Sequence, residues 1–400
     1  MIAMVLEMEE VVRETVLESG ASSEVHTLVR AFKNCFGAAP ICLPSPCGRN
    51  TIRPPAPFDS AGILESSLSD ASENSSGNLD SRDVDFVPVL RSGGWADIGS
   101  RSNMEDVYVC LDDFFHNYGL SDGNRPNAFY GVFDGHGGKH AADFASNNLP
   151  KFILESNDYP MNVERVISSA FLQTDTAFAE ACSLDSDLAS GTTALAALVV
   201  DGFLIVANAG DCRAVLSRRG VAIEMSSDHK PGCGKEKIRI EALGGFVYDG
   251  YLNGQLNVAR ALGDWHVEGL KDTNGLGPLS AEPELKNMKL TKDDEFLIIA
   301  CDGIWDVFRS QNAVDFARRK LQEHNDPVIC CKELIAEALK RNSCCDNLSV
   351  VVVCFQPKAP PRLTVPRFRV NRTVSAQGLK DLQDILDGFG GGDDRDDSDY

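Results

Sequence analysis

The chain has 400 residues, of which 43% are hydrophobic, enough for a substantial core. Its formal net charge of −21 argues against unaided binding to nucleic acid or to an anionic membrane surface, because Lys and Arg supply the affinity for both. Its 13 cysteines are scattered and odd in number, no secretory signal is evident and no apolar run reaches the ~18 residues of a membrane span, so we expect an intracellular protein with reduced thiols, in the cytosol or nucleus.

The first 85 residues differ in composition from the rest. A short amphipathic helix is predicted at residues 4–17, after which prolines gather between positions 40 and 57, and serines and acidic residues between 59 and 76. Such a segment buries too little apolar surface to offset the entropy lost on ordering. We therefore expect residues 1–85 to be a mostly disordered, Pro- and Ser-rich extension.

From residue 86 onward, short apolar runs bounded by turn residues alternate with amphipathic stretches of helical period. Strands are predicted at residues 94–98, 107–111, 129–133, 194–200, 203–207, 214–217, 296–300 and 348–355. Helices are predicted at residues 139–155, 162–182, 235–243, 311–323 and 328–342. Ser310 and Asp326 are expected to be the N-caps of the last two helices. Strand pairs joined by tight turns favour antiparallel sheets and an α+β fold over a repeating βαβ barrel.

After residue 357 the composition shifts again. Prolines and arginines are mixed up to residue 372, a short helix is predicted at 379–386, and residues 393–399 form an acidic run. Runs of like charge are usually solvated. We therefore expect residues 358–400 to be a tail with an acidic end.

Asp134 directly follows the predicted strand at residues 129–133, and a glycine-rich turn that contains His136 comes next. Glycines allow a sharp turn with positive φ and a close approach of backbone to a ligand. A carboxylate beside open backbone suits a hard metal ion, and His136 can transfer a proton near neutral pH. A plain strand–turn–helix connection, in which Asp134 and His136 only cap and hydrogen-bond, explains this motif alone equally well.

Other acidic residues also stand at the ends of predicted strands, several of them beside Gly or Asn: Glu105, Asp106, Asp211, Asp302 and Asp346. Asp306 lies four residues after Asp302. Two like charges 4 Å apart repel by about 1–4 kcal/mol, and several such pairs would rival a domain's whole stability of roughly 5–15 kcal/mol. Either the residues are dispersed in turns, or divalent ions hold them together. Oxygen ligands favour Mg²⁺ or Mn²⁺, and zinc is disfavoured because no Cys-x-x-Cys pairs accompany His136.

Eight motifs in order along the chain resemble the signatures of the metal-dependent, type 2C protein serine/threonine phosphatases. They are GSRSNMED at residues 99–106, FDGHGG at 133–138, GTTA at 191–194, ANAGDCR at 207–213, DHKP at 228–231, ARALGD at 259–264, CDGIWD at 301–306 and DN at 346–347. The resemblance spans about residues 88–356. The variant at residues 263–266 and the long N-terminal extension resemble the plant branch.

The resemblance implies a sandwich of two antiparallel sheets with helices outside, an α-β-β-α order, and a metal centre at one end of the sandwich. The phosphatase domain would occupy residues 86–357, with a variable flap at about 230–258 that tunes substrate choice. A hormone-coreceptor role, known for one plant subgroup, is not expected, because that subgroup uses a Trp that residues 244–258 lack.

The resemblance also assigns roles to the acidic residues. Asp134 would bridge two ions, Mg²⁺ or Mn²⁺, and the Gly135 carbonyl would bind one of them. Asp302 and Asp346 would hold the other ion. Four more residues complete the set: Glu105 and Asp106 on these ions or just behind them, and Asp211 and Asp306, with Asp302, at a weaker third site.

The implied reaction is the hydrolysis of phosphoserine and phosphothreonine in signalling proteins by direct attack of a metal-activated water. Arg101 would bind the phosphate oxygens through its fork of donors, and His136 would protonate the leaving oxygen. We expect a monomer whose partners are phosphorylated protein substrates, with no nucleic acid and no membrane.

Two other functions have to be weighed. The first is a cysteine-dependent phosphatase, because Cys-x5-Arg occurs at Cys47, Cys212 and Cys233. Cys47 lies in the Pro-rich extension, Cys212 leads into a strand where a phosphate loop should open a helix, and Glu236 would repel phosphate near Cys233. The second is a catalytically inactive binding module, which would have lost a ligand position, and none of the positions named above is lost.

The sequence departs from the family pattern just before Asp346, where Cys344 and Cys345 replace the Gly-Ser-Lys/Arg of many relatives. Neighbouring thiols beside a metal ligand could make activity sensitive to oxidation. Two small residues in a turn explain them more simply, since thiol reactivity requires a lowered pKa that sequence does not show.

Overall fold

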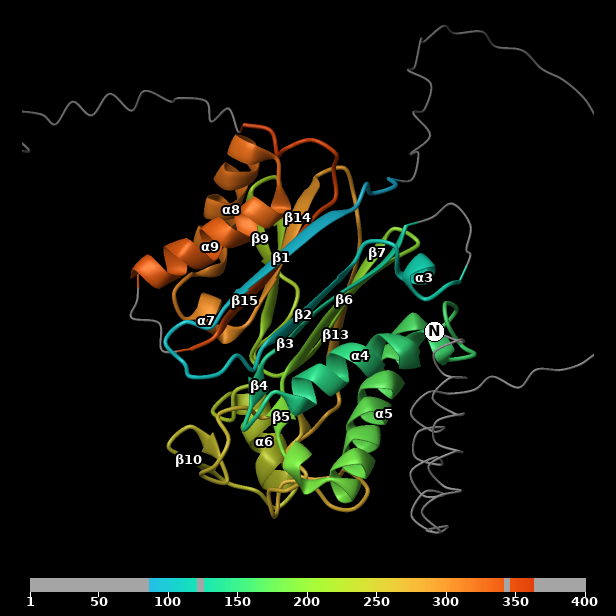
Figure 1. Cartoon of the computed structure of the whole chain (residues 1–400), viewed down its shortest axis with the longest axis vertical. Helices are drawn as coiled ribbons and strands as arrows, with labels where there is room; N and C mark the ends of the chain where they lie inside the picture. The colour runs from blue at the N-terminus through green and yellow to red at the C-terminus, as the bar shows by residue number, and fades with distance from the viewer. Residues whose placement is uncertain (1–85, 121–125, 342–345, 363–400) are drawn as a thin grey trace, which may run out of the picture. The chain divides into compact units, whose positions relative to one another are not determined.

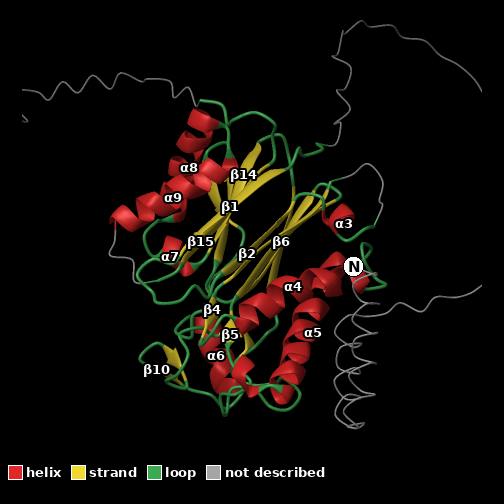
Figure 2. Cartoon of the chain, in the orientation of Figure 1, coloured by secondary structure: helices red, strands yellow, loops and turns green. Residues whose placement is uncertain are grey.

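The computed structural model describes residues 86–120, 126–341 and 346–362. In this part of the chain, two five-stranded antiparallel sheets pack face to face and helices cover both outer faces (Figures 1 and 2). The predicted α-β-β-α fold is thus confirmed. The expected extension, most of the expected tail and the helices predicted at 4–17 and 379–386 lie outside the described residues, as do Cys344 and Cys345.

The first sheet has the order β1-β15-β14-β8-β9 and the second the order β13-β7-β6-β3-β2. The strands of the first sheet are β1 (Arg91–Asp97), β15 (Leu348–Cys354), β14 (Asp294–Ala300), β8 (Arg213–Arg218) and β9 (Val221–Glu224). Those of the second are β13 (Glu284–Lys289), β7 (Phe203–Ala209), β6 (Ala194–Val200), β3 (Asn127–Phe133) and β2 (Val107–Leu111). The central strands are buried along their whole length because one face meets the other sheet and the other face meets helices.

Three hydrophobic layers hold the sandwich together. Between the sheets, alternate residues of both interdigitate, among them Tyr130, Leu195 and Val351. Outside the second sheet lie α4 (His140–Glu155) and α5 (Val163–Leu184), and outside the first lie α8 (Ser310–His324) and α9 (Pro327–Arg341). None of the described helices is long and apolar enough to cross a membrane.

Of the two predicted helix N-caps, one is confirmed and one is wrong. Asp326 accepts hydrogen bonds from the backbone N–H of Val328 at 2.8 Å and of Ile329 at 3.1 Å, at the start of α9. Ser310 is instead the first residue of α8, and its hydroxyl donates to Glu224 of β9 at 2.6 Å. Ser310 therefore does not cap the helix, because its hydroxyl bonds to Glu224, a residue distant in the sequence.

One end of the sandwich carries the smaller elements. A three-stranded sheet has the order β12-β5-β4, from Leu262–Gly263, Gly191–Thr192 and Gly135–His136. The helix α6 (Gly234–Ala242) and the hairpin β10–β11 (Val247–Tyr248, Tyr251–Leu252) lie in the predicted flap. They share a separate hydrophobic cluster that includes Ile240, Leu252 and Leu279, so the packed unit reaches beyond residue 258. The remaining short helices are α3 (Phe114–Asn117), η1 (Ser186–Leu188) and α7 (Asp302–Trp305).

Candidate metal centre

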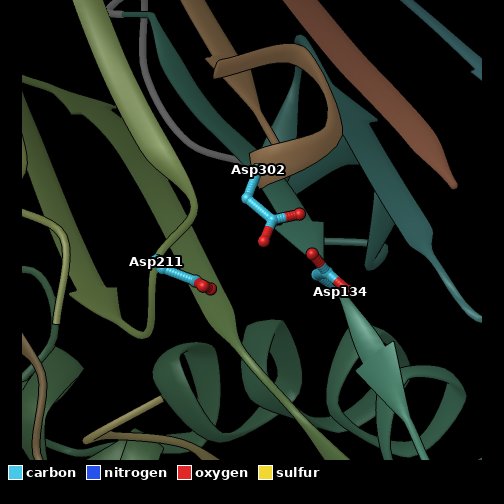
Figure 3. A group of neighbouring side chains, drawn as sticks. All are labelled: Asp134, Asp211 and Asp302. Atoms are coloured by element: carbon cyan, nitrogen blue, oxygen red, sulfur yellow. The ribbon is translucent and has the colours of Figure 1, made fainter. Parts of the chain in front are cut away.

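Three aspartates meet at the end of the sandwich that carries these smaller elements. Asp134 follows β3, Asp211 follows the β7 strand by two residues, and Asp302 begins α7 directly after β14. One carboxylate oxygen from each lies within 4.8 Å of the others, and the three side chains point toward a common space (Figure 3). Because β3 and β7 belong to one sheet and β14 to the other, the cluster joins the ends of both sheets.

A cavity of about 230 Å³ opens over these aspartates. Eight of the ten predicted site residues line it: Arg101, Glu105, Asp134, Gly135, His136, Asp211, Asp302 and Asp346. Five of the eight are carboxylates, so the predicted convergence of strand-end acids is seen in the fold. Asp106 and Asp306 do not line the cavity.

Asp106 lies behind the cavity and is 7% exposed. Burial is the main cause that raises its pKa to about 6, and the neighbouring polar side chains of Ser349, Cys301 and Asp134 oppose this shift. Its Oδ2 atom is buried and has no hydrogen-bond partner among the described residues. Its charge raises the pKa of Asp134, and a cation bound at Asp134 would stabilise both carboxylates.

The electrostatics of the cluster favour a bound cation. Burial raises the pKa of Asp134 well above its usual range, and the neighbouring carboxylates, Asp106 and Asp302 foremost, raise it further. Burial, followed by the charge of Asp211, raises the pKa of Asp302 to about 7. A divalent ion would remove these penalties, and a donor set made of oxygen alone fits Mg²⁺ or Mn²⁺.

Lys230 is a cation to which the sequence assigned no role, although it lies in the DHKP motif at residues 228–231. Its ammonium group bonds the carboxylate of Asp211 and lies 3.6 Å from that of Asp302. Asp306 is exposed at the end of α7; burial raises its pKa, Lys230 opposes this, and Asp211 adds to it. Lys230 therefore contacts Asp211 and Asp302 of the predicted third site, and its charge lowers the pKa of Asp306.

Arg101 and Asp346 lie at the mouth of the cavity. The Arg101 guanidinium donates to Asp346 Oδ2 at 2.9 Å, and the two side chains are 55% and 40% exposed. Asn347 fixes the loop that carries Arg101: its Nδ2 donates to the carbonyls of Ile98 and Asn103 at 3.0 Å, and its Oδ1 accepts from Glu105 N at 2.9 Å. This support was missed, since nothing in the dipeptide Asp-Asn signals a partner more than 240 residues away.

Gly135 is required by a close approach of two backbones. A Cβ atom there would lie 2.4 Å from the carbonyl oxygen of Glu105. The turn is also fixed from the other side, because Thr193 N donates to the Asp134 carbonyl at 2.9 Å and Asp134 N donates to Thr193 Oγ1 at 3.2 Å. The backbone around the predicted metal ligands is thus held on both sides.

His136 lines the cavity, and its side chain is 30% exposed. Its Nε2 atom lies 2.8 Å from Oδ2 of Asp264, a residue to which the sequence assigned no role. Burial lowers the pKa of His136, but the hydrogen bond and the charge of Asp264 outweigh this effect, so the pKa is raised above its ordinary value. A protonated His136 can donate a proton to a group bound in the cavity.

The cysteines do not form a nucleophilic site in the described part of the chain. Cys212 is fully buried and leads into β8, and burial raises its pKa well above the usual range, so it stays a thiol. Cys233 precedes α6, but Glu236 in the following turn binds Arg239 and Arg260 rather than leaving an anion site open. The Cys-x5-Arg matches therefore carry no phosphate loop at either place.

The chain is similar to known proteins. The family described as Protein phosphatase 2C matches residues 92–348. The chain is 69% identical over 311 residues to "Probable protein phosphatase 2C 57" of Oryza sativa subsp. japonica, covering 78% of this chain and 84% of the relative. It is 60% identical over 350 residues to "Probable protein phosphatase 2C 22" of Arabidopsis thaliana, covering 86% and 88%.

Solved structures show the same fold. A serine-threonine phosphatase 2C from Toxoplasma gondii superimposes with a TM-score of 0.57 at 23% identity, covering 68% of this chain and 98% of that one. A sex determining protein from C. elegans superimposes with a TM-score of 0.59 at 25% identity, covering 67% and 65%.

Proposed function

This chain belongs to the protein phosphatase 2C family, and from that premise we propose that it hydrolyses phosphoserine and phosphothreonine in signalling proteins with the help of Mg²⁺ or Mn²⁺. The observation that carries the proposal is the convergence of Asp134, Asp211 and Asp302 within 4.8 Å, in a cavity with two further carboxylates. Clustered acids of this kind are costly unless cations are bound.

We assign the metal-holding role to Asp134, the Gly135 carbonyl, Asp302 and Asp346 for two ions. Glu105 and Asp106 would support these ions, and Asp211 and Asp306 would form a weaker third site. The bound ions would supply an activated water and would offset the negative charge that develops on the phosphoryl group.

The remaining steps belong to the chain's own side chains. Arg101 sits at the cavity mouth and would bind the phosphate oxygens, exchanging its partner Asp346 for the substrate. His136 would donate its proton to the serine or threonine oxygen as the bond to phosphorus breaks. The catalytic unit would comprise residues 86–357, act as a monomer inside the cell, and select substrates through the flap.

The test is phosphate release from a phosphothreonine peptide, with Mn²⁺ and with a chelator. We expect release with the metal and none with the chelator; no release with metal, or equal release in both, would reject the metal mechanism. Asp134→Ala should reduce turnover at least about 100-fold while the fold survives. The matched control is Asp293→Ala, because Asp293 is an acid in the turn at the far end of β14 and 42% exposed, and its rate should stay unchanged.

A further inference from the structure

The three-stranded sheet β12-β5-β4 brings His136 and Asp264 together across its middle strand. Gly191 of β5 pairs with His136 on one side and with Gly263 on the other. A Cβ atom at Gly191 would lie 2.2 Å from both His136 Nε2 and Asp264 Oδ2. The glycine therefore leaves the space in which His136 of β4 meets Asp264, the residue that follows β12.

The contact itself is close, and its aspartate is shielded from water. His136 Nε2 lies 3.0 Å from Oδ1 and 2.8 Å from Oδ2 of Asp264, whose side chain is 2% exposed. A ring nitrogen beside a carboxylate carries the proton, so Nε2 is the donor in this pair. With Nε2 bound to Asp264, Nδ1 is the ring nitrogen left for a group bound in the cavity that His136 lines.

The backbone of Asp264 is held in a conformation that few residues adopt. Its φ is +58°, in the left-handed region, and its N–H donates to the Ser190 carbonyl at 2.9 Å. Such strain persists only where the surroundings enforce it. Here it turns a buried carboxylate toward the ring of His136.

A buried ion pair enforces this conformation. Lys271 Nζ, with 1% of its side chain exposed, bonds both carboxylate oxygens of Asp175 at 2.8 and 2.9 Å. The same ammonium group donates to the Gly263 carbonyl at 2.9 Å, and Asp175 Oδ1 accepts from Gly263 N at 2.7 Å and from Trp265 Nε1 at 3.2 Å. The Lys271–Asp175 pair thus hydrogen-bonds to Gly263 and Trp265, the residues on either side of Asp264.

We propose that Asp264 is a positioning residue that fixes the His136 ring, with Nε2 bound to its carboxylate and Nδ1 directed to the leaving oxygen of the substrate. This inference rests on the proposed role of His136 as proton donor. Proton donation matters most when the leaving group is a poor one, such as the alkoxide of serine or threonine. It matters little for p-nitrophenolate, which leaves readily without a proton.

The experiment compares these two leaving groups in Asp264→Asn, a change that keeps the shape of the side chain and tolerates the left-handed backbone. We expect the kcat for a phosphothreonine peptide to fall about 10-fold or more, and the kcat for p-nitrophenyl phosphate to fall less than about 3-fold. Equal losses on the two substrates, or no loss on either, would overturn the inference. The control is Asp294→Asn, a fully buried acid paired with Arg218 at the opposite end of β14, which should show no preference between substrates.

A double mutant tests whether Asp264 acts through His136. In a His136→Ala background, Asp264→Asn should change the peptide rate by less than about 2-fold, because residues that act as a unit are not additive. A loss as large as that in the native background would show that Asp264 acts independently and would overturn the inference.

A readout without turnover separates this inference from the proposed function. In protein labelled with ¹⁵N-histidine, the Nε2–H proton of His136 should be protected from exchange; it should vanish in His136→Gln and exchange rapidly in Asp264→Asn. A native protein without this proton would contradict the positioning role even if it were an active phosphatase. An observed proton in a protein with no metal-dependent turnover would reject the proposed function alone.

Discussion

At the scale of single residues, two acids of the cavity have raised pKa values, which disfavour their charged forms. Asp134 and Asp302 are raised in pKa first by burial and then by other carboxylates, whereas Lys230 partly compensates Asp302. Without a cation, the folded protein therefore prefers Asp302 protonated up to near neutral pH. The unfolded chain has no such preference.

This difference predicts how the metal-free protein responds to pH. The pKa of Asp302 is about 7 in the fold against 3.8 ordinarily, so between these values the folded state binds more protons than the unfolded state. The stabilisation is complete below about pH 4 and is lost as the pH rises through 7, with a total of the order of 4 kcal/mol. Urea denaturation in chelator at pH 5 and pH 8 should show a larger loss in the native protein than in Asp302→Asn. Equal losses in the two proteins would contradict this account.

At the scale of elements, Glu236 connects the flap helix to the rest of the site. It is 5% exposed, and its carboxylate accepts from Arg260 at 2.7 Å and from Arg239 at 2.9 Å. Arg260 belongs to the segment that leads into β12, two strands away from His136 in the small sheet. The Glu236 carboxylate thus adds an ion pair to the packing that holds the flap helix against the segment before β12.

Glu236→Gln should therefore loosen the flap. Arg239 and Arg260 would lose their shared anion, and removing one partner of a buried ion pair typically costs about 3 kcal/mol. Hydrogen exchange should report faster opening of α6 while β3 and β14 stay protected. The control is Glu241→Gln on the same helix, since Glu241 is 54% exposed and 3.8 Å from Lys237, and such surface pairs contribute little. Similar exchange in both variants would show that the pair does not hold the flap.

The elements also show how far the sequence was sufficient. The buried strands β3, β6, β14 and β15 were predicted from their unbroken apolar runs, which are too short for a helix and are bounded by turn residues. The strand β13 was missed, because Glu-Leu-Lys-Asn-Met-Lys has the polarity of a surface loop and is recruited by pairing with β7. The strand propensity of its residues does not predict β13, because the strand forms by pairing with β7.

The same limit applies to the site. The strand-end acids were found because acidic residues recur directly after or before apolar runs, several of them beside Gly or Asn, and the family resemblance supplied their roles. The partnership of His136 with Asp264 spans 128 positions, and no local pattern predicts it. Lys230 was overlooked because a lysine before a proline is ordinary in a turn, and only the folded chain brings it against Asp211.

At the scale of the whole molecule, the candidate metal centre links the two sheets. Asp134 and Asp211 come from the second sheet, and Asp302 and Asp346 stand at strand ends of the first. Any ion bound by members of both groups has to be released when the sheets separate. Metal binding and the stability of the sandwich are therefore coupled.

We accordingly expect Mn²⁺ or Mg²⁺ to raise the melting temperature. At one hundred times the Kd, binding to the folded state alone contributes about 2.7 kcal/mol, which for a domain of this size corresponds to a shift of about 5–10 °C. Differential scanning calorimetry with metal and with chelator measures the shift, and Asp134→Ala should lose most of it. Coincident melting curves for the native protein would mean that the carboxylates bind no ion together.

The edge strand β13 affects the tendency of the protein to aggregate. It pairs with β7 along one side, and its sequence places Glu284, Lys286 and Lys289 along a strand that borders the sheet. Charged side chains on a border strand discourage a second molecule from adding its own strand there. The polarity that hid β13 from sequence reasoning thus protects the sandwich against edge-to-edge aggregation.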